Sequence, residues 1–192
     1  AFKLAHALVK RGRQEGLQKE RDLDLKQYLD LVALGTVADL VPLTGENRKL
    51  VRSGLEQLGD TDRPGLVALK NVANVSKTVT VFNVGFHLGP RLNAAGRMDN
   101  PEASLNLLLA KDRYEAEKAA ETLDNYNNER RKIERDISTQ AVESVRKHFD
   151  PKNDFVIVEG NMEWHLGVIG IVASRVMREF YRPTFILASD GD

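Results

Sequence analysis

The sequence predicts an α/β protein that is mostly helical and contains a long helix connecting two domains. Most of the first 110 residues space their apolar side chains at helical intervals. Residues 112–148 contain no Gly or Pro and are rich in good helix formers. After Asp150-Pro151 the period changes, because two strand-like segments, DFVIVE and PTFILA, flank a mostly apolar helix. Such a β-α-β order favours parallel strands and a right-handed crossover.

The N-terminal part is expected to consist of short helices. The first sixteen residues form one helix, residues 18–26 an exposed connector, and a second helical stretch runs from Leu25 into LDLVALGTVADLVPL, where Pro42 ends it. Further helices are expected at 46–58 and 64–75, the latter with Pro64 in its first turn.

The next segment has weaker signals. KTVTVF, residues 77–82, is predicted as a short strand, and VGFHLGPRLNAAGR as a helix interrupted near Gly89-Pro90 and followed by a turn of small residues. Asn100-Pro101-Glu102 is expected to begin a short helix that runs to Ala110.

The helix at 112–148 would be roughly 50 Å long at 1.5 Å per residue. Its apolar residues leave one narrow stripe, formed by Ala116, Ala119, Ala120, Leu123, Tyr126, Ile133, Ile137, Ala141 and Val145. Such a length exceeds the core of one small domain, which predicts a connector between two. Because two strands do not make a stable parallel sheet, the chain is expected to end inside a domain.

Composition limits the function classes only loosely. The 192 residues include 28 Lys+Arg and 28 Asp+Glu, so no global charge attracts polyanions. No run of eighteen apolar residues is present, and the chain does not open on a signal peptide. The absence of Cys excludes disulfides and thiolate metal sites and is compatible with a reducing compartment. A cytoplasmic, membrane-free location is therefore expected.

Asp39, in GTVADL, is the first candidate site residue. A carboxylate inside so apolar a run is costly to desolvate unless it is paired, hydrogen-bonded or bound to a cation. A helix cap or a partner for a nearby Arg is the alternative interpretation.

The second candidate is PRLNAAGRMD, residues 90–99. Arg91, Asn93 and Arg97 lie among Gly and Ala, which allow a phosphate to approach, and Arg can give phosphate oxygens two hydrogen bonds at once. A tight helix–helix contact with arginines at its rim explains the pattern equally well.

The third candidate is WHLGVIGIVASR, where His165 falls between a strand and a helix. Free N–H groups at a helix start favour an anion, and this end of the strands is the usual ligand site in α/β sheets. A structural role for the histidine is the alternative. The glycines do not make a dinucleotide fingerprint, and ERRKIERD in the long helix is expected to be a solvated charged face.

Seven blocks in order resemble the RecJ family of single-stranded-DNA-specific exonucleases, within the DHH phosphoesterase superfamily: ALGTVADLVPL, NRKLVRSGL, RPGLVAL, GPRLNAAGRMD, LDNYNNERRKIE, WHLGVIGIVASR and YRPTFILA. The resemblance covers nearly the whole chain. It implies degradation of single-stranded DNA from the 5′ end with Mn²⁺ or Mg²⁺ as cofactor. It also implies the C-terminal part of a DHH domain at residues 1–110, a connecting helix at 111–150 and the start of a DHHA1 domain at 151–192.

The resemblance assigns roles residue by residue. Asp39 matches a metal ligand, Arg97 an arginine near the scissile phosphate, and His165 a histidine that faces the cleft. Arg91 and Asn93 are weaker matches as DNA-phosphate contacts. Single-stranded DNA is the implied partner, together with a single-strand-binding protein or a helicase, and the oligomeric state stays open.

One departure concerns the metal site. No Asp-His-His triplet occurs in this sequence, although in the family it supplies much of the metal site. The chain is therefore expected to be a middle portion of the enzyme and inactive alone. A phosphodiesterase of the same two-domain plan, acting on oligonucleotides or cyclic dinucleotides, and a non-catalytic RecJ-like replication scaffold stay open as alternatives.

Overall fold

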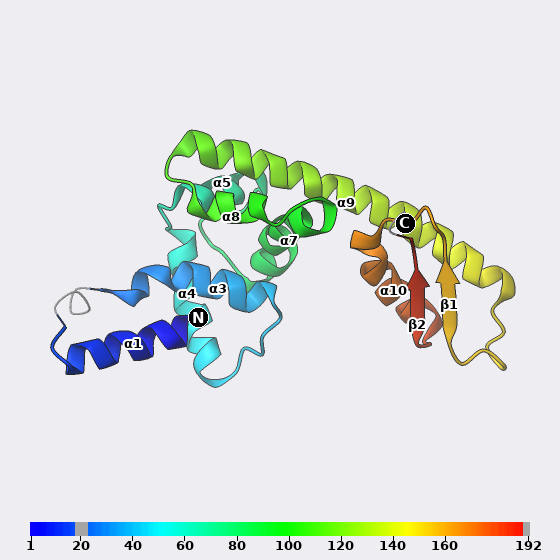
Figure 1. Ribbon diagram of the computed structural model, residues 1–192, viewed down its shortest axis with the longest axis horizontal. Helices are drawn as coiled ribbons and strands as arrows, with labels where there is room; N and C mark the ends of the chain where they lie inside the picture. Colours follow the sequence, from blue (N-terminus) through cyan, green and yellow to red (C-terminus); the bar gives the residue numbers. More distant parts are fainter. Residues whose placement is uncertain (18–22, 190–192) are drawn as a thin grey trace. The chain divides into compact units, whose positions relative to one another are not determined.

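The structure is a computed structural model that describes residues 1–17 and 23–189, and it is mostly helical with one small parallel sheet (Figure 1). The chain forms two compact units. The first comprises Ala1–Pro90 and Ala110–Glu117, and the second Arg91–Leu109 and Lys118–Asp192. The domain boundaries implied by the resemblance stay a prediction. No helix in the described ranges has the length and apolarity needed to cross a bilayer.

The first unit contains the short helices that the sequence predicts. They are α1 (Phe2–Gln14), the 3₁₀ turn η1 (Leu25–Tyr28), α3 (Leu29–Ala38), α4 (Gly45–Gly59) and α5 (Pro64–Val72). Pro64 begins α5 as expected. Of the connector predicted at 18–26, residues 18–22 lie outside the described residues, and Asp24 caps η1 by accepting a hydrogen bond from the Lys26 N–H.

The strand predicted at 77–82 is wrong. Thr80 instead caps a helix: its hydroxyl accepts from the Asn83 N–H at 3.2 Å, and the Asn83 side chain accepts from the Thr80 N–H at 2.9 Å. This reciprocal capping box begins α6 (Val81–Asn83), which continues as the π-helical segment η2 (Val84–Leu88). The Thr/Val alternation that suggested a strand is too short to outweigh this local cap.

The turn of small residues predicted after Gly89-Pro90 is also wrong. Residues Gly89–Met98 form the helix α7, which directly follows η2. Pro90 is compatible with this arrangement because it lies in the first turn, where its missing N–H would have no partner within the helix. The interruption of the helix takes the form of the π-helical segment before Gly89.

A buried carboxylate organises the first unit. Asp30 on α3 is 1% exposed and accepts hydrogen bonds from Arg63 Nε at 3.0 Å and from the Thr61 hydroxyl at 3.0 Å. Its other oxygen accepts from the Leu31 N–H at 2.8 Å. Asp30 therefore has the charged and hydrogen-bonding partners that a buried carboxylate requires.

The second unit contains α8 (Glu102–Leu109), most of α9 (Arg113–His148), β1 (Ile157–Gly160), α10 (Leu166–Phe180) and β2 (Thr184–Leu187). The cap at Asn100, the long helix and the β-α-β order are as predicted, since Asn100 accepts from the Glu102 N–H and β1 pairs in parallel with β2. The core lies between α9, the sheet and α10, and consists of Ile137, Ala141, Val145, Ile157, Trp164, Val168, Val172, Val176 and Ile186.

Two helical glycines of the first unit make a matched test of the α3–α4 packing. A Cβ at Gly54 on α4 would overlap the Leu29 carbonyl oxygen and lie 2.7 Å from the Ala33 Cβ, whereas a Cβ at Gly35 on α3 would meet nothing within 4 Å. Gly54→Ala should lower the free energy of unfolding by about 2 kcal/mol, because overpacking outweighs the helix-propensity gain. Gly35→Ala should raise it by up to about 1 kcal/mol. Urea unfolding followed by circular dichroism measures both, and equal effects would contradict this packing.

Candidate functional site

The second and third candidate motifs, 70 residues apart in sequence, meet in the second unit. Arg97, in the last turn of α7, donates from Nη1 to the Gly167 carbonyl oxygen at 3.1 Å. Gly167 lies in the first turn of α10, and a Cβ there would overlap the Arg97 carbonyl oxygen. The two backbones can therefore lie this close only because position 167 has no side chain.

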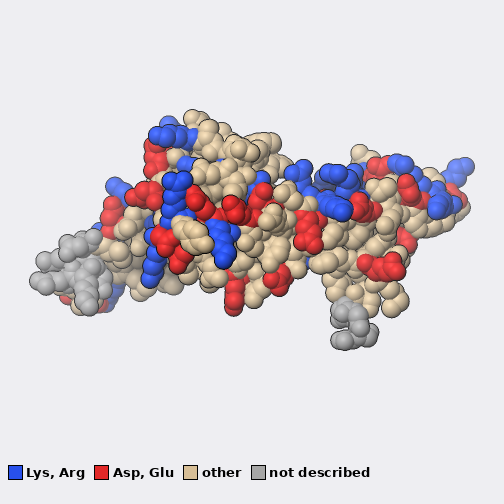
Figure 2. Space-filling view, turned by 90° about the horizontal axis from the view of Figure 1, so that it is seen from above, with Lys and Arg blue, Asp and Glu red and all other residues tan. Residues whose placement is uncertain are grey.

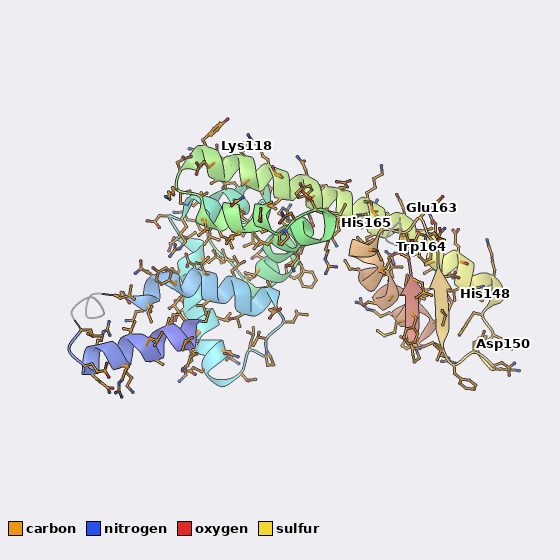
Figure 3. All side chains as sticks on the ribbon, in the orientation of Figure 1. Lys118, His148, Asp150, Glu163, Trp164 and His165 are labelled. Carbon is orange, nitrogen blue, oxygen red and sulfur yellow. The ribbon has the colours of Figure 1, made fainter. Side chains whose placement is uncertain are left out.

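His165 lies at the same place, as the N-cap of α10 (Figure 3). Its Nδ1 accepts a hydrogen bond from the Gly167 N–H at 3.1 Å, so in this state the ring proton is on Nε2. The sequence correctly placed this histidine where a strand leads into a helix. The capping bond satisfies one of the free N–H groups of the helix start, while Nε2–H is available as a donor.

Trp164 precedes this cap and packs in the core. It is 5% exposed, and its indole N–H donates to the Gln140 side chain on α9 at 2.9 Å. The contact attaches the start of α10 to the long helix and holds His165 in a fixed place.

Arg130 is a buried cation near Arg97 that the sequence interpretation missed. The prediction that ERRKIERD is a solvated face is wrong at this position, because the Arg130 side chain is only 13% exposed. It pairs with Glu134 at 2.7 Å and donates to Asn127 at 3.1 Å, while its Nε is buried without a hydrogen-bond partner among the described residues. Burial lowers the pKa of the Arg130 guanidinium, Glu134 opposes this effect, and the nearby positive charge of Arg97 adds to it.

A sequence signal for Arg130 exists. Buried residues recur along α9 at intervals of three and four, as at Ala120, Leu123 and Asn127 before it and Ile137 and Ala141 after it. Position 130 continues this series, seven residues from both Leu123 and Ile137. The apolar stripe is therefore interrupted by a polar group, and such an interruption of a buried seam indicates a specific role.

The other two residues of the arginine motif differ in their surroundings. Arg91 Nε donates to Asp124 on α9 at 2.8 Å, and the two side chains are 16% and 27% exposed. Asn93 is exposed on α7. Arg91 thus has a structural ion pair within the unit.

Asp39 belongs to the first unit and caps the C-terminus of α3. The apolar run around Asp39 does not bury it: Asp39 is exposed, and the buried carboxylate of the segment is Asp30. Among residues 1–17 and 23–189, the Asp39 side chain has no hydrogen bond or ion pair. Its carboxylate is therefore available to a ligand.

The backbone around Asp39 is tightly closed. The Leu40 N–H donates to the Val37 carbonyl at 3.1 Å and the Val41 N–H to the Thr36 carbonyl at 3.1 Å, the two bonds of a Schellman motif. Leu40 has φ +55°, a left-handed conformation that costs a non-glycine residue about 1–2 kcal/mol. Asp39 thus lies in a fixed and strained helix end.

The described residues do not by themselves fit a divalent-cation site. No group of three or more His, Asp or Glu side chains within the described ranges is arranged to hold a metal ion. Asp39 offers one carboxylate, whereas Mg²⁺ and Mn²⁺ take several oxygen or nitrogen ligands.

The comparisons with known proteins agree with the motifs. The chain is 39% identical over 193 residues to the single-stranded-DNA-specific exonuclease RecJ of Bacillus subtilis (strain 168), and 40% identical over 200 residues to that of Escherichia coli (strain K12). Each match covers 100% of this chain. The chain belongs to the RecJ family. No protein-family model matches it. It spans 23% and 34% of the lengths of these two RecJ proteins.

Solved RecJ structures have the same fold. The crystal structure of RecJ from Thermus thermophilus in complex with Mg²⁺ superposes with a TM-score of 0.79 at 35% identity, covering 90% of this chain and 27% of that one. A crystal structure of exonuclease RecJ bound to manganese gives the same TM-score and identity, covering 90% of this chain and 43% of that one. The predicted family is thereby confirmed in sequence and in fold.

Gly167 and Gly170 test the contact between the two motifs. Both lie on α10, but a Cβ at Gly170 would meet nothing within 4 Å. Gly167→Ala should lower the free energy of unfolding by about 2 kcal/mol and shift the amide NMR resonances around Arg97 and His165, because the two backbones must separate. Gly170→Ala should leave these resonances in place and be neutral or stabilising by up to about 1 kcal/mol. Unchanged resonances in Gly167→Ala would contradict the contact.

Proposed function

We propose that this chain is part of a 5′→3′ exonuclease specific for single-stranded DNA. The observation that supports the proposal most strongly is the identity of about 40% along the whole chain to proteins named single-stranded-DNA-specific exonucleases. The proposed domain organisation is the one that the resemblance implies, with part of a DHH domain at 1–110, a connecting helix at 111–150 and the start of a DHHA1 domain at 151–192. Cytoplasmic location and a single-strand-binding protein or helicase as partner belong to the same proposal.

Arg97 is proposed to bind the phosphate at which the strand is cut. Its bond to Gly167 uses one N–H and fixes the guanidinium, which leaves further donors for phosphate oxygens. A guanidinium held in place before the reaction stabilises developing negative charge without reorganising. His165, with Nε2–H available beside it, is proposed as a second donor, and Arg91 and Asn93 as contacts to neighbouring phosphates.

The proposed phosphate binding depends on local side chains. The numbers of basic and acidic residues are equal, and both kinds are interspersed on the face drawn in Figure 2. Binding is therefore proposed to depend on a few fixed cations rather than on the charge of the whole chain, and should weaken with added salt for each phosphate contacted.

Asp39 is proposed as one ligand of a site for two Mn²⁺ or Mg²⁺ ions. An exposed carboxylate on a rigid helix end, with no partner in the part of the chain that the structure describes, suits such a role. Because the described residues do not supply the remaining ligands, these would come from other segments of a full-length protein.

The isolated 192-residue chain should show no exonuclease activity, because one carboxylate does not hold two hard cations against water. Incubation with 5′-phosphorylated single-stranded DNA and Mn²⁺ should release no mononucleotides above the buffer control. Robust release would refute the proposal that the active site is incomplete.

In the full-length protein, Asp39→Ala should reduce turnover of single-stranded DNA by at least about a thousandfold if the carboxylate helps to hold the metal pair. Asp62→Ala removes another exposed carboxylate of the first unit and serves as the control. The thermal unfolding midpoints should match for both variants. Retained turnover in Asp39→Ala would exclude the ligand role.

A second measurement compares the rates at which the unaltered full-length protein hydrolyses a long single strand and a dinucleotide. This comparison separates an exonuclease from an oligonucleotide phosphodiesterase.

A further inference from the structure

Two aromatic rings on the first unit are stacked and open to solvent. Phe82 on α6 and Phe86 on η2 are 59% and 70% exposed, with ring centroids 4.7 Å apart and an interplanar angle of 28°. The His87 ring contacts Phe82 edge-on at 5.6 Å. Stacking of the two rings against each other leaves their outer faces in water, where a large apolar surface is usually a binding surface.

The segment that presents these rings is fixed on its other side. Val84 and Leu88 are fully buried, and the capping box at Thr80 and Asn83 sets the start of the helix. Gly89, directly after η2, packs so closely on α3 that an added Cβ would lie 3.3 Å from the Ala38 Cβ. Phe82 and Phe86 therefore lie on the continuous α6–η2 segment, whose π-helical part contacts α3, the helix that ends at Asp39. The π-helical turns of proteins occur frequently at functional sites.

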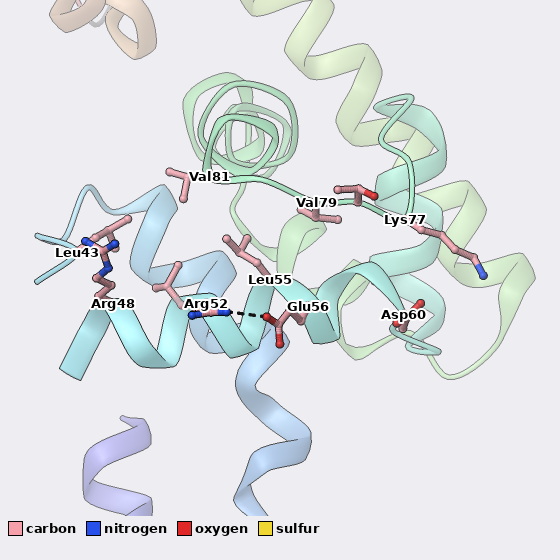
Figure 4. Close-up of a pocket in the computed structure, with 11 residues that line it drawn as sticks. Leu43, Arg48, Arg52, Leu55, Glu56, Asp60, Lys77, Val79 and Val81 are labelled. Carbon is pink, nitrogen blue, oxygen red and sulfur yellow. Dashed lines mark ion pairs between the residues drawn. The ribbon is translucent and has the colours of Figure 1, made fainter. Parts of the chain in front are cut away.

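A pocket of about 830 Å³ is lined by several cationic side chains and by Val81, the residue before Phe82 (Figure 4). Val81 and Arg48 lie toward one end of it, and Lys77 toward the other. Arg52 in its wall faces Glu56 at 3.6 Å. Arg48 and Lys77 have no ion pair with any residue in the described ranges. The Arg48 guanidinium and the Lys77 ammonium group are therefore available to an anionic ligand.

We propose that Phe82 and Phe86 form a stacking site for the bases of a single DNA strand, whose phosphates contact Arg48 and Lys77. Aromatic faces accept any base, and nearby cations hold the sugar–phosphate backbone; the two together are the usual basis of sequence-independent single-strand binding. Only a single strand offers unpaired base faces to such a site. The inference rests on the proposed function and adds to it a place where strand preference arises.

The test measures binding by the full-length protein in EDTA, so that no cleavage occurs. The probe is a 20-nucleotide single strand containing 2-aminopurine, whose fluorescence falls when the base stacks. Phe82→Leu and Phe86→Leu keep apolar bulk but remove the ring, and each should weaken binding by roughly fivefold or more and reduce the quenching. Phe86→Trp should retain both. Tyr114→Leu, which removes an exposed ring on α9, is the matched control and should bind as the unaltered protein does.

Arg48→Ala tests the contribution of charge. The variant should make the slope of log K against log salt less steep by about 0.7, the amount expected for the loss of one phosphate contact to a single strand. Leu variants that bind and quench as the unaltered protein does would overturn the inference while leaving the exonuclease proposal intact. The stacking inference would also be overturned if Phe86→Trp and Phe86→Leu lowered the unfolding midpoint equally. The rings would then pack against another protein segment instead of facing solvent. An unaltered protein that does not bind single-stranded DNA at all would overturn the proposed function itself.

Discussion

The second unit depends on a backbone contact between the end of α7 and the start of α10. Position 167 must be glycine because the Arg97 carbonyl oxygen occupies the space of a Cβ. This contact makes two further interactions possible, the Arg97 bond to the Gly167 carbonyl and the His165 cap on the Gly167 N–H. The RLNAAGR and WHLGVIG motifs are thus parts of one structural feature, and their small residues serve a close approach of backbones, with the cations placed by it.

The charged groups near the core separate into structural and available ones. Asp30 is buried and its charge is satisfied by Arg63, whereas Asp39, nine residues later, is exposed and without a side-chain partner among the described residues. Arg130 lies between these cases, since Glu134 and Asn127 occupy its terminal nitrogens while Nε is unsatisfied. Leaving a buried donor unpaired costs about 1–3 kcal/mol. This cost falls in the buried seam of α9, within reach of the positive charge of Arg97.

Elements with an uninterrupted periodic pattern could be predicted from sequence, whether the long helix or the short strands, and the segment with mixed local signals could not. The uninterrupted helix at 113–148 and the parallel β-α-β order have periodicities that local effects do not disturb. Residues 77–98 were misjudged because a capping box and a Pro in a first turn allow helix where alternation and Gly-Pro suggest otherwise. His165 was placed correctly by its position at a strand-to-helix junction. Arg130 was missed because charged residues surround it in the sequence, whereas its side chain is buried by the packing of α9 and pairs with Glu134.

The end of α3 combines two features that would be unfavourable in a purely structural helix terminus. Leu40 adopts a left-handed conformation where glycine would be free of strain, and it is 87% exposed, so no packing within the described residues offsets the cost. The neighbouring segment exposes the Phe82 and Phe86 rings while burying Val84 and Leu88. Strain at the end of α3 and exposed apolar surface on the segment that contacts α3 therefore occur in the same unit. Both features are explained if this helix end serves to hold a ligand rather than to maximise stability. A binding surface keeps apolar side chains exposed in the free protein because the ligand covers them on binding.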